Sequence, residues 1–524
     1  MRIIKALTSV NLSNIDLMFI YLAYENLNRY LSLCLKDTYN LLKVKSLATT
    51  QELIIMPLQI FRTKQVTAHD IHSKGLNRCL SAWDLAFLGV GAIIGTGIFV
   101  LTGIAAATQS GPAVILSFVI AGLACAFAAL SYAELASSVG GCGSAYGYSY
   151  AAFGELIAFM IGWDLLLEYG ISVAAVANGW SGYFNNALTA IGFGLPDVLT
   201  KAPKMGGLIN LPAFAIIIIL MGVLIMGVKH SAKANNAMVV VKLMTISIFI
   251  GIAIFNVHPD NWHPFMPFGW FQTLPDGKTT GVLAGASLVF FAYVGFDAVS
   301  TAAEEAKNPQ HDLPFGIITS LAFCTIIYII VAGLLTGVVP YTDLNVSSPV
   351  AHALSLLGYN WASALISTGV IAGLTTVMLV LYYGLTRIIF AMSRDGLLSP
   401  FFSKLNSKTQ TPIRVIVLCG LIIALIAGFM PLGDLAELVN IGTLAAFVLV
   451  CLGVVVLRIT QPSMPRPFTT PFSPLFPVLG MLSCGALMAF LPALTWLRFI
   501  VWLVIGLIVY FSYSMAHSKL AKVT

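Results

Sequence analysis

Hydrophobic residues in this chain form long blocks that are separated by short polar connections. A helix of about 20 apolar residues crosses the roughly 30 Å hydrocarbon core of a bilayer. The pattern therefore predicts an all-α membrane protein with twelve transmembrane helices. We expect the spans at residues 84–104, 112–135, 155–184, 211–229, 235–256, 281–303, 314–338, 361–392, 413–430, 434–457, 475–495 and 497–516.

The composition supports this pattern and excludes a water-soluble fold. Of the 524 residues, 58% are hydrophobic and 9% are charged, whereas about 25% are charged in a typical soluble protein. The mean hydropathy is +0.92. The net charge of +6 does not indicate nucleic-acid binding, because the Lys and Arg residues lie in short connections and form no patch with interleaved aromatic residues.

Eight cysteines are present, without CxxC or CxxH spacing, and most of them lie inside apolar blocks. A thiol in such a block behaves as a small hydrophobic group. We therefore expect neither a structural disulfide nor a zinc site. No metal ion and no cofactor is predicted.

Both chain termini are predicted to be cytoplasmic, because Lys and Arg accumulate on the cytoplasmic side of a membrane. From residue 56 onward, 16 of the 21 Lys and Arg residues fall on the side of the segment before the first span. Residues 1–55 differ from the rest: the apolar run at 15–24 is too short to span and is not followed by a signal-peptide cleavage site. We expect a mis-called start or a dispensable extension there, with a short helix at the membrane surface as the alternative.

Two spans carry glycines at mid-membrane depth, where an interruption of the helix is expected. The first contains Gly91, Gly95 and Gly97, and the sixth contains Gly295 followed by Asp297. Glycine lowers helix propensity by about 1 kcal/mol relative to alanine and allows other backbone angles. Close helix packing through small residues is the alternative explanation for the first motif. An offset of five spans reverses the direction through the membrane, which indicates inverted repeats with matching broken helices.

This repeat divides the chain into predicted segments. We expect the N-terminal extension at 1–55, a cytoplasmic segment at 56–83, the first inverted repeat at 84–256, the second at 281–457, two extra helices at 475–516 and a cytoplasmic tail at 517–524.

The chemistry of an interrupted helix suggests a ligand. Unwinding leaves N–H groups unpaired at one half-helix N-terminus and C=O groups unpaired at the opposing C-terminus, and neither can face lipid. The N–H end suits a carboxylate, and the C=O end suits an ammonium group. Together they fit the head of an α-amino acid with any side chain.

Ionisable residues within spans are functional candidates because their burial is costly. Asp164 and Glu168 are four residues apart and share a helix face; a structural role is favoured for Asp164, and pocket, gate and structural roles stay open for Glu168. Lys242 lies about 12 Å inside the fifth span, where snorkelling to the surface is the alternative. Asp297 is placed to cap the second half-helix. Met378 is either core or a wall of the pocket.

The chain resembles the bacterial members of the cationic amino acid transporter family, within the amino acid, polyamine and organocation superfamily. The resemblance covers residues from about 75 to 515. It is carried by GAIIGTGIFV at 91–100, YAELA at 132–136, GWD at 162–164 with EY at 168–169, FAYVGFD at 291–297, AEE at 303–305, KNP at 307–309, DLP at 312–314, AMSRDGL at 391–397 and RPF at 466–468. One departure is the GGCG sequence at 140–143, where relatives usually carry a proline and a Ser or Thr.

The resemblance implies a LeuT-type fold of five plus five helices with broken helices 1 and 6. It implies that Lys242 takes the place of a sodium ion between spans one, five and eight and couples transport to protons. Glu168 would lie at the pocket or gate. The substrate would be held by Ile93, Gly95, Thr96 and Gly97 and, across the cavity, by Phe291, Ala292 and Val294, with Met378 near the pocket.

We therefore predict a secondary active permease of the inner cell membrane that imports amino acids by proton symport and alternating access. An exchanger with the same site is the alternative, and a passive channel is a remote one. An enzyme is not expected, since no HExxH motif occurs and no histidine lies deep in a span. The expected partners are the amino acid, the proton and the lipid bilayer; whether a small single-span subunit accompanies the chain is left open. Apolar walls favour small neutral substrates.

Overall fold

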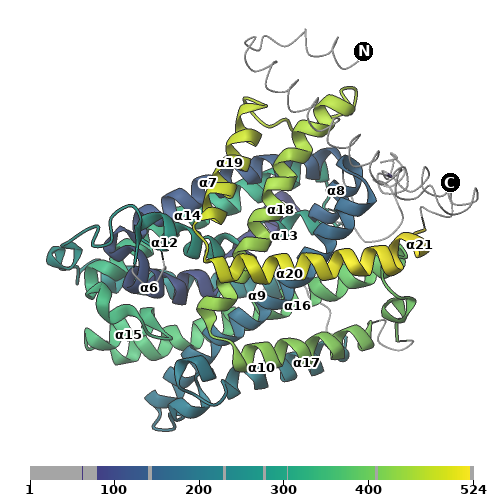
Figure 1. Cartoon of the computed structure of the whole chain (residues 1–524). Coiled ribbons are helices and arrows are strands. Elements are labelled where there is room, and N and C mark those ends of the chain that lie inside the picture. Colours follow the sequence, from purple (N-terminus) through teal and green to yellow (C-terminus); the bar gives the residue numbers. More distant parts are fainter. Residues whose placement is uncertain are drawn as a thin grey trace, which may run out of the picture. The chain divides into compact units, whose positions relative to one another are not determined.

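The computed structural model describes Arg62 and residues 80–139, 144–227, 232–274, 279–303, 305–406 and 411–519 (Figure 1). The expectations for residues 1–55 and the unusual sequence at 140–143 lie outside these described residues. The described residues belong to the structural unit that extends from Ile60 to Thr524.

The described residues form a bundle of apolar helices, as the hydropathy pattern predicts. Eight helical segments are long and apolar enough to cross a membrane, and four further apolar helices have 10–17 residues. Each of the twelve predicted blocks contains helix. The helices are α5 (Ala82–Ile93), α6 (Thr102–Ala105), α7 (Val114–Ser138), α8 (Ser144–Ala152), α9 (Glu155–Ala190), α10 (Leu211–Ile225), α11 (Ala232–Ala253), α12 (Val282–Val289), α13 (Ala298–Thr301), α14 (Pro309–Val338), α15 (Pro349–Leu356), α16 (Asn360–Arg394), α17 (Ile413–Phe429), α18 (Leu432–Thr460), α19 (Leu475–Ala489), α20 (Ala493–Val509) and α21 (Met515–His517).

Strand structure in the described residues is limited to one short hairpin. Strand β1 (Gln272–Thr273) pairs antiparallel with β2 (Thr279–Thr280) in the loop before α12. The rest of the described chain is helical or irregular, so the molecule is an all-helical membrane protein.

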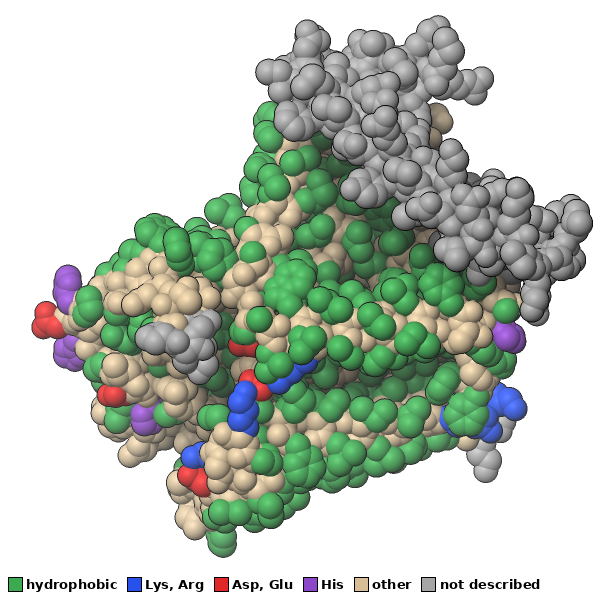
Figure 2. Space-filling model, viewed as in Figure 1, with side chains coloured by type: hydrophobic (Ala, Val, Ile, Leu, Met, Phe, Trp, Pro, Cys, Tyr) green, Lys and Arg blue, Asp and Glu red, His purple; other side chains and the backbone are tan. Residues whose placement is uncertain are grey.

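Apolar side chains on the outside of the bundle point to the surrounding lipid. On α20 the exposed residues include Leu497, Val501 and Ile508, and on α17 they include Leu421 and Leu425. Figure 2 shows hydrophobic side chains over most of the face along these two helices. Exposure of such an apolar surface to water would be costly, whereas its contact with the hydrocarbon of a bilayer is favourable.

Two long helices organise the interior. Helices α9 and α16 have 36 and 35 residues and pack along one another, and α14 packs against both α5 and α7. The start of α5 is defined by a capping box, in which the Ser81 side chain accepts from the Asp84 N–H and the Asp84 carboxylate accepts from the Ser81 N–H.

Both predicted interruptions are present. Helix α5 ends at Ile93 and is followed by a two-residue bend. The chain then becomes helical again, and the segment η1 (Gly97–Leu101) has π-helical hydrogen bonds. Helix α12 ends at Val289, and a 3-10 turn, η7 (Phe290–Tyr293), and four turn residues precede α13. Gly295 has a φ of +114°, a conformation that favours glycine, so this residue permits the second interruption.

Candidate functional site

The two interruptions lie against each other. A Cβ atom on residue 97 would lie 2.2 Å from the Cα of Ala292, and a Cβ on residue 295 would lie 3.1 Å from the carbonyl carbon of Ala92. Glycine at 97 and 295 therefore allows one irregular backbone segment to approach the other. The packing explanation and the unwinding explanation for these glycines are both right, because unwound backbone in an apolar bundle has to be covered by protein.

Tyr328 of α14 connects the two interruptions. Its hydroxyl oxygen lies 2.8 Å from the carbonyl oxygen of Ile93 and 3.0 Å from that of Ala292, and its side chain is fully buried. One hydroxyl hydrogen is thus shared between a carbonyl of each segment. The rings of Phe118 and Tyr293 pack against the tyrosine. The hydropathy pattern did not reveal this residue, because a tyrosine inside an apolar block resembles any other core aromatic.

Backbone donors remain on the other side of the first interruption. The first N–H groups of a helical segment have no partner within it, and η1 begins at Gly97. The predicted binding residues around this point are buried, with exposed fractions of 1% for Ile93 and 0% for Thr96. In the second interruption, Phe291, Ala292 and Val294 have exposed fractions below 10%. The structure therefore brings the two predicted groups of backbone atoms into one enclosed region.

The Thr96 hydroxyl is a polar group without a partner in this region. Its Oγ1 atom is buried and makes no hydrogen bond to any residue that the structure describes. Gly179 of α9 leaves room for the threonine, since a Cβ there would lie 2.5 Å from Thr96 Cγ2. A buried hydroxyl without a partner is costly, so Thr96 is available to a bound polar ligand.

An apolar side chain of α16 lies beside the first interruption. Met378 on α16 is fully buried, and its neighbour Val377 faces the backbone at Gly95, with 3.9 Å between a Cβ on residue 95 and Val377 Cγ1. Phe291 is 6% exposed on the opposing segment. An apolar environment of this kind suits an uncharged side chain.

Lys242 on α11 points into the bundle. Its Nζ donates a hydrogen bond of 2.6 Å to the Gly91 carbonyl on α5, and the residue is 1% exposed. Its aliphatic part packs on α16, where a Cβ on Gly373 would lie 2.9 Å from Lys242 Cγ. The lysine thus bridges the first, fifth and eighth predicted spans, where the family resemblance places it. The alternative that it snorkels to the surface is wrong.

Three acidic residues are buried near the second interruption. Asp164, Glu168 and Asp297 are each at most 3% exposed, and Glu168 lies within electrostatic range of the other two and beside Thr443 of α18. Asp164 Oδ1 has no hydrogen-bond partner among the described residues. Asp297 occupies the N-cap position of α13, but its side chain forms no capping hydrogen bond, so the prediction that its carboxylate caps this half-helix is wrong.

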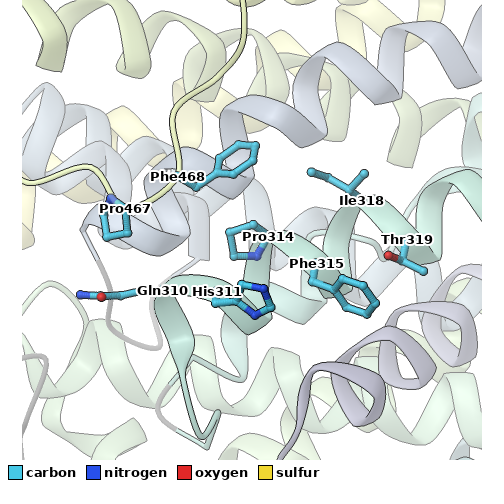
Figure 3. Close-up of a pocket in the computed structure, with 8 residues that line it drawn as sticks. All are labelled: Gln310, His311, Pro314, Phe315, Ile318, Thr319, Pro467 and Phe468. Atoms are coloured by element: carbon cyan, nitrogen blue, oxygen red, sulfur yellow. The ribbon is translucent and has the colours of Figure 1, made fainter.

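A cavity of about 500 Å³ lies elsewhere, at the start of α14 (Figure 3). Figure 3 shows the His311 and Phe315 rings on one side of it and Phe468 on the other. None of its lining residues belongs to the predicted site. They are Gln310, His311, Pro314, Phe315, Ile318, Thr319, Pro467 and Phe468.

Comparison with known proteins assigns the chain to a family of membrane transporters. The amino acid permease family model matches residues 80–517. The chain therefore belongs to the amino acid permease family and is a multi-pass transport protein, not an enzyme. This confirms the resemblance at the level of the superfamily.

Relatives within the family carry different names. The methylthioribose transporter of Bacillus subtilis (strain 168) is 50% identical over 467 residues, which is 88% of this chain and 99% of that protein. Branched-chain amino acid permease BcaP of the same organism is 50% identical over 469 residues, which is also 88% of this chain and 99% of that protein. The vacuolar cationic amino acid transporter 4 of Arabidopsis thaliana is 38% identical over 410 residues, which is 77% of this chain and 68% of that protein.

Proposed function

We propose that the protein imports a neutral amino acid, together with a proton, by alternating access around the two helix interruptions. The observation that carries this proposal is the contact between the two unwound segments, with Gly97 against Ala292 and with Tyr328 bonded to both. Unpaired N–H groups on one side and carbonyl groups on the other match the two charges of an amino acid head.

The architecture that goes with this function is the LeuT-type fold. In this arrangement twelve helices span the membrane, α5 to α11 form the first repeat, α12 to α18 form the second, and α19 and α20 are additional. Two interruptions at corresponding places in repeats of opposite orientation support this assignment. We place both termini in the cytoplasm and the protein in the inner cell membrane, on the distribution of Lys and Arg.

The binding groups follow from the same arrangement. The N–H groups near the start of η1 would hold the carboxylate, and the remaining lone pairs of carbonyls at the two interruptions would hold the ammonium group. Met378 and Phe291 would contact the side chain of the substrate, and Glu168 would act at the pocket or gate. The head-group residues are Ile93, Gly95, Thr96, Gly97, Phe291, Ala292 and Val294.

Proton coupling is assigned to Lys242. When the ammonium group is charged, its hydrogen bond to the Gly91 carbonyl fastens α5 onto α11. A neutral amine would bind that carbonyl more weakly. Gain and loss of one proton at Lys242 would therefore alternately fasten and release α5.

The substrate is best assigned to the branched-chain amino acids. The apolar surroundings of Met378 and Val377 suit an aliphatic side chain, and a relative named as a branched-chain amino acid permease is 50% identical. Methylthioribose is a second candidate, because the relative named as its transporter is also 50% identical to this chain. That molecule has neither a carboxylate nor an ammonium group, so it would leave the proposed head-group site unused.

Uptake into proteoliposomes tests the proposal. Purified protein is supplied with labelled leucine, isoleucine, valine, lysine or methylthioribose under an inward proton gradient. We expect saturable uptake of the branched-chain amino acids that collapses when the gradient is removed. Uptake that needs internal amino acid would identify an exchanger, currents far above carrier turnover would identify a channel, and uptake of methylthioribose alone would refute the amino acid site.

A further inference from the structure

Glu155 is a buried acidic residue that the proposed transport site does not use. It is the first residue of α9 and has an exposed fraction of 0%. Its Oε2 accepts hydrogen bonds from the hydroxyls of Ser518, at 2.6 Å, and Tyr150, at 3.0 Å. Its Oε1 accepts from the Tyr510 hydroxyl at 3.3 Å. One carboxyl group thus joins α8 to two points of the C-terminal segment 510–519.

The donors explain how this buried group is accommodated. No ion pair within the described ranges includes Glu155, so its oxygens depend on the three hydroxyls. Burial raises the pKa of the Tyr150 phenol above its ordinary value, and the charge of Glu155 acts in the same direction, so this hydroxyl remains a donor. Loss of a donor would leave a buried acceptor unpaired, which is costly.

The C-terminal segment is also fastened to the end of α16. The N–H of Lys519 donates to the Asp395 carbonyl at 3.0 Å, and the Ser514 hydroxyl donates to the Leu397 carbonyl at 2.6 Å. Gly396, with a φ of +85°, makes room for the His517 carbonyl, because a Cβ there would lie 2.3 Å from that oxygen.

Helix α8 connects this segment to the second interruption. Its Tyr146 hydroxyl donates to the Asp395 carboxylate at 2.9 Å. At its first residue, the Ser144 hydroxyl accepts from Ser300 of α13 at 3.0 Å. Figure 1 shows α8 and α21 at the same end of the bundle. The bonds therefore form a continuous link from the C-terminal segment, through α8, to the half-helix that follows the second interruption.

We propose that Glu155 is a positioning residue that latches segment 510–519 onto α8 and thereby keeps this end of the transporter closed. The latch rests on the proposed alternating access, since a closed end matters only if it opens during transport. Opening would separate α8 from the C-terminal segment, and the three hydroxyl bonds of Glu155 oppose that separation.

Hydrogen exchange measured by mass spectrometry on the full-length protein tests the latch. The variants are Glu155→Gln, which replaces one acceptor oxygen with a donor, and Ser518→Ala, which removes the shortest bond. The matched control is Ser512→Ala, because the exposed Ser512 hydroxyl bonds the Val509 carbonyl of its own helix and no other described residue. We expect exchange in both residues 144–152 and residues 510–519 to rise at least tenfold in the two variants and to stay unchanged in the control.

Transport measurements distinguish a latch from a residue that only stabilises the fold. A weakened latch shifts the population toward the inward-open state, so initial uptake should fall at least threefold. The substrate Kd in detergent, where both sides are accessible, should move less than twofold. A double variant that combines Glu155→Gln with Ser518→Ala should show the same initial uptake as either single variant, since all three act on one latch.

The outcomes separate the latch from the transport proposal. Unchanged exchange in α8 for both variants would overturn the latch even if uptake persists. A Kd that worsens as much as the uptake rate would also overturn it, because the defect would then be general. If no amino acid is transported at all, the exchange experiment still reports whether Glu155 holds the two segments together.

Discussion

Gly97 and Ala292 are in backbone contact across the two helix interruptions. A Cβ on residue 97 would lie 2.2 Å from Ala292 Cα and 2.4 Å from Ala292 Cβ. Because these atoms belong to backbone or to a short side chain, they cannot rotate away. The contact therefore determines which glycine of the first interruption tolerates a side chain.

Gly97→Ala is expected to abolish substrate binding, whereas Gly95→Ala is not. The methyl group at 97 would force the two segments apart, and overpacking of this kind costs about 1–3 kcal/mol. At 95 the nearest atoms would be 3.9 Å away, an ordinary contact. Thermal-shift titration of both variants with leucine, after confirming equal amounts in the membrane, measures the difference. Wild-type affinity in Gly97→Ala would mean that the segments do not form the site.

Tyr328→Phe should weaken substrate binding at least tenfold. It leaves the Ile93 and Ala292 carbonyls without their shared donor, at a cost of about 1–3 kcal/mol for an unpaired buried group. Tyr382→Phe is the matched control, because that buried tyrosine donates to the Ile416 carbonyl of α17 instead. Equilibrium binding and thermal unfolding are measured for both. Equal loss of affinity in the two variants would contradict a specific role for Tyr328.

The interruptions could be predicted from the sequence because glycine acts locally, on the backbone angles of its own residue. Tyr328 could not, since its role depends on which carbonyl groups its hydroxyl reaches after α14 has packed. The sequence places Thr96 at the first interruption, but only the packed structure reveals that its hydroxyl makes no hydrogen bond to the described residues.

Contacts between motifs that lie far apart in the chain could not be predicted from the sequence either. The sequence drew attention to Glu134 and to Arg466 separately, as parts of two family segments. In the structure Glu134 Oε1 lies 3.6 Å from Arg466 Nε, and Arg458 binds the same carboxylate through two bonds of 2.9 and 2.6 Å. Nothing in their spacing indicates this pairing, because it depends on how α7 and α18 pack.

Arg458→Ala should lower stability without changing the substrate Kd. Glu134 is 2% exposed and would lose a bidentate partner, while the Thr470 N–H would remain bonded at 2.7 Å. Hydrogen bonds to charged groups contribute about 1.5–3 kcal/mol, so the melting temperature should fall. Arg498→Ala is the control, since its partner Asp434 is more exposed and keeps Lys204. A change in Kd with an unchanged melting temperature would contradict this assignment.

The Lys242 ammonium group on α11 binds the Gly91 carbonyl two residues before the end of α5. Lys242→Ala should lose uptake driven by an inward proton gradient, because a methyl group can neither bind the Gly91 carbonyl nor gain and lose a proton. Lys242→Arg should fail as well, since a guanidinium stays protonated and the residue packs closely on Gly373. Wild-type uptake should need no sodium.

Labelled leucine uptake into proteoliposomes after an imposed pH step, with and without sodium, measures these effects. Lys204→Ala is the control, because that lysine is an exposed partner of Asp434 and its loss removes a charge outside the bundle; its uptake should match the wild type. Exchange of leucine at equal pH should survive in Lys242→Ala if α5 can still move. Gradient-driven uptake that persists in Lys242→Ala, or a strict sodium requirement in the wild type, would remove Lys242 as the coupling group.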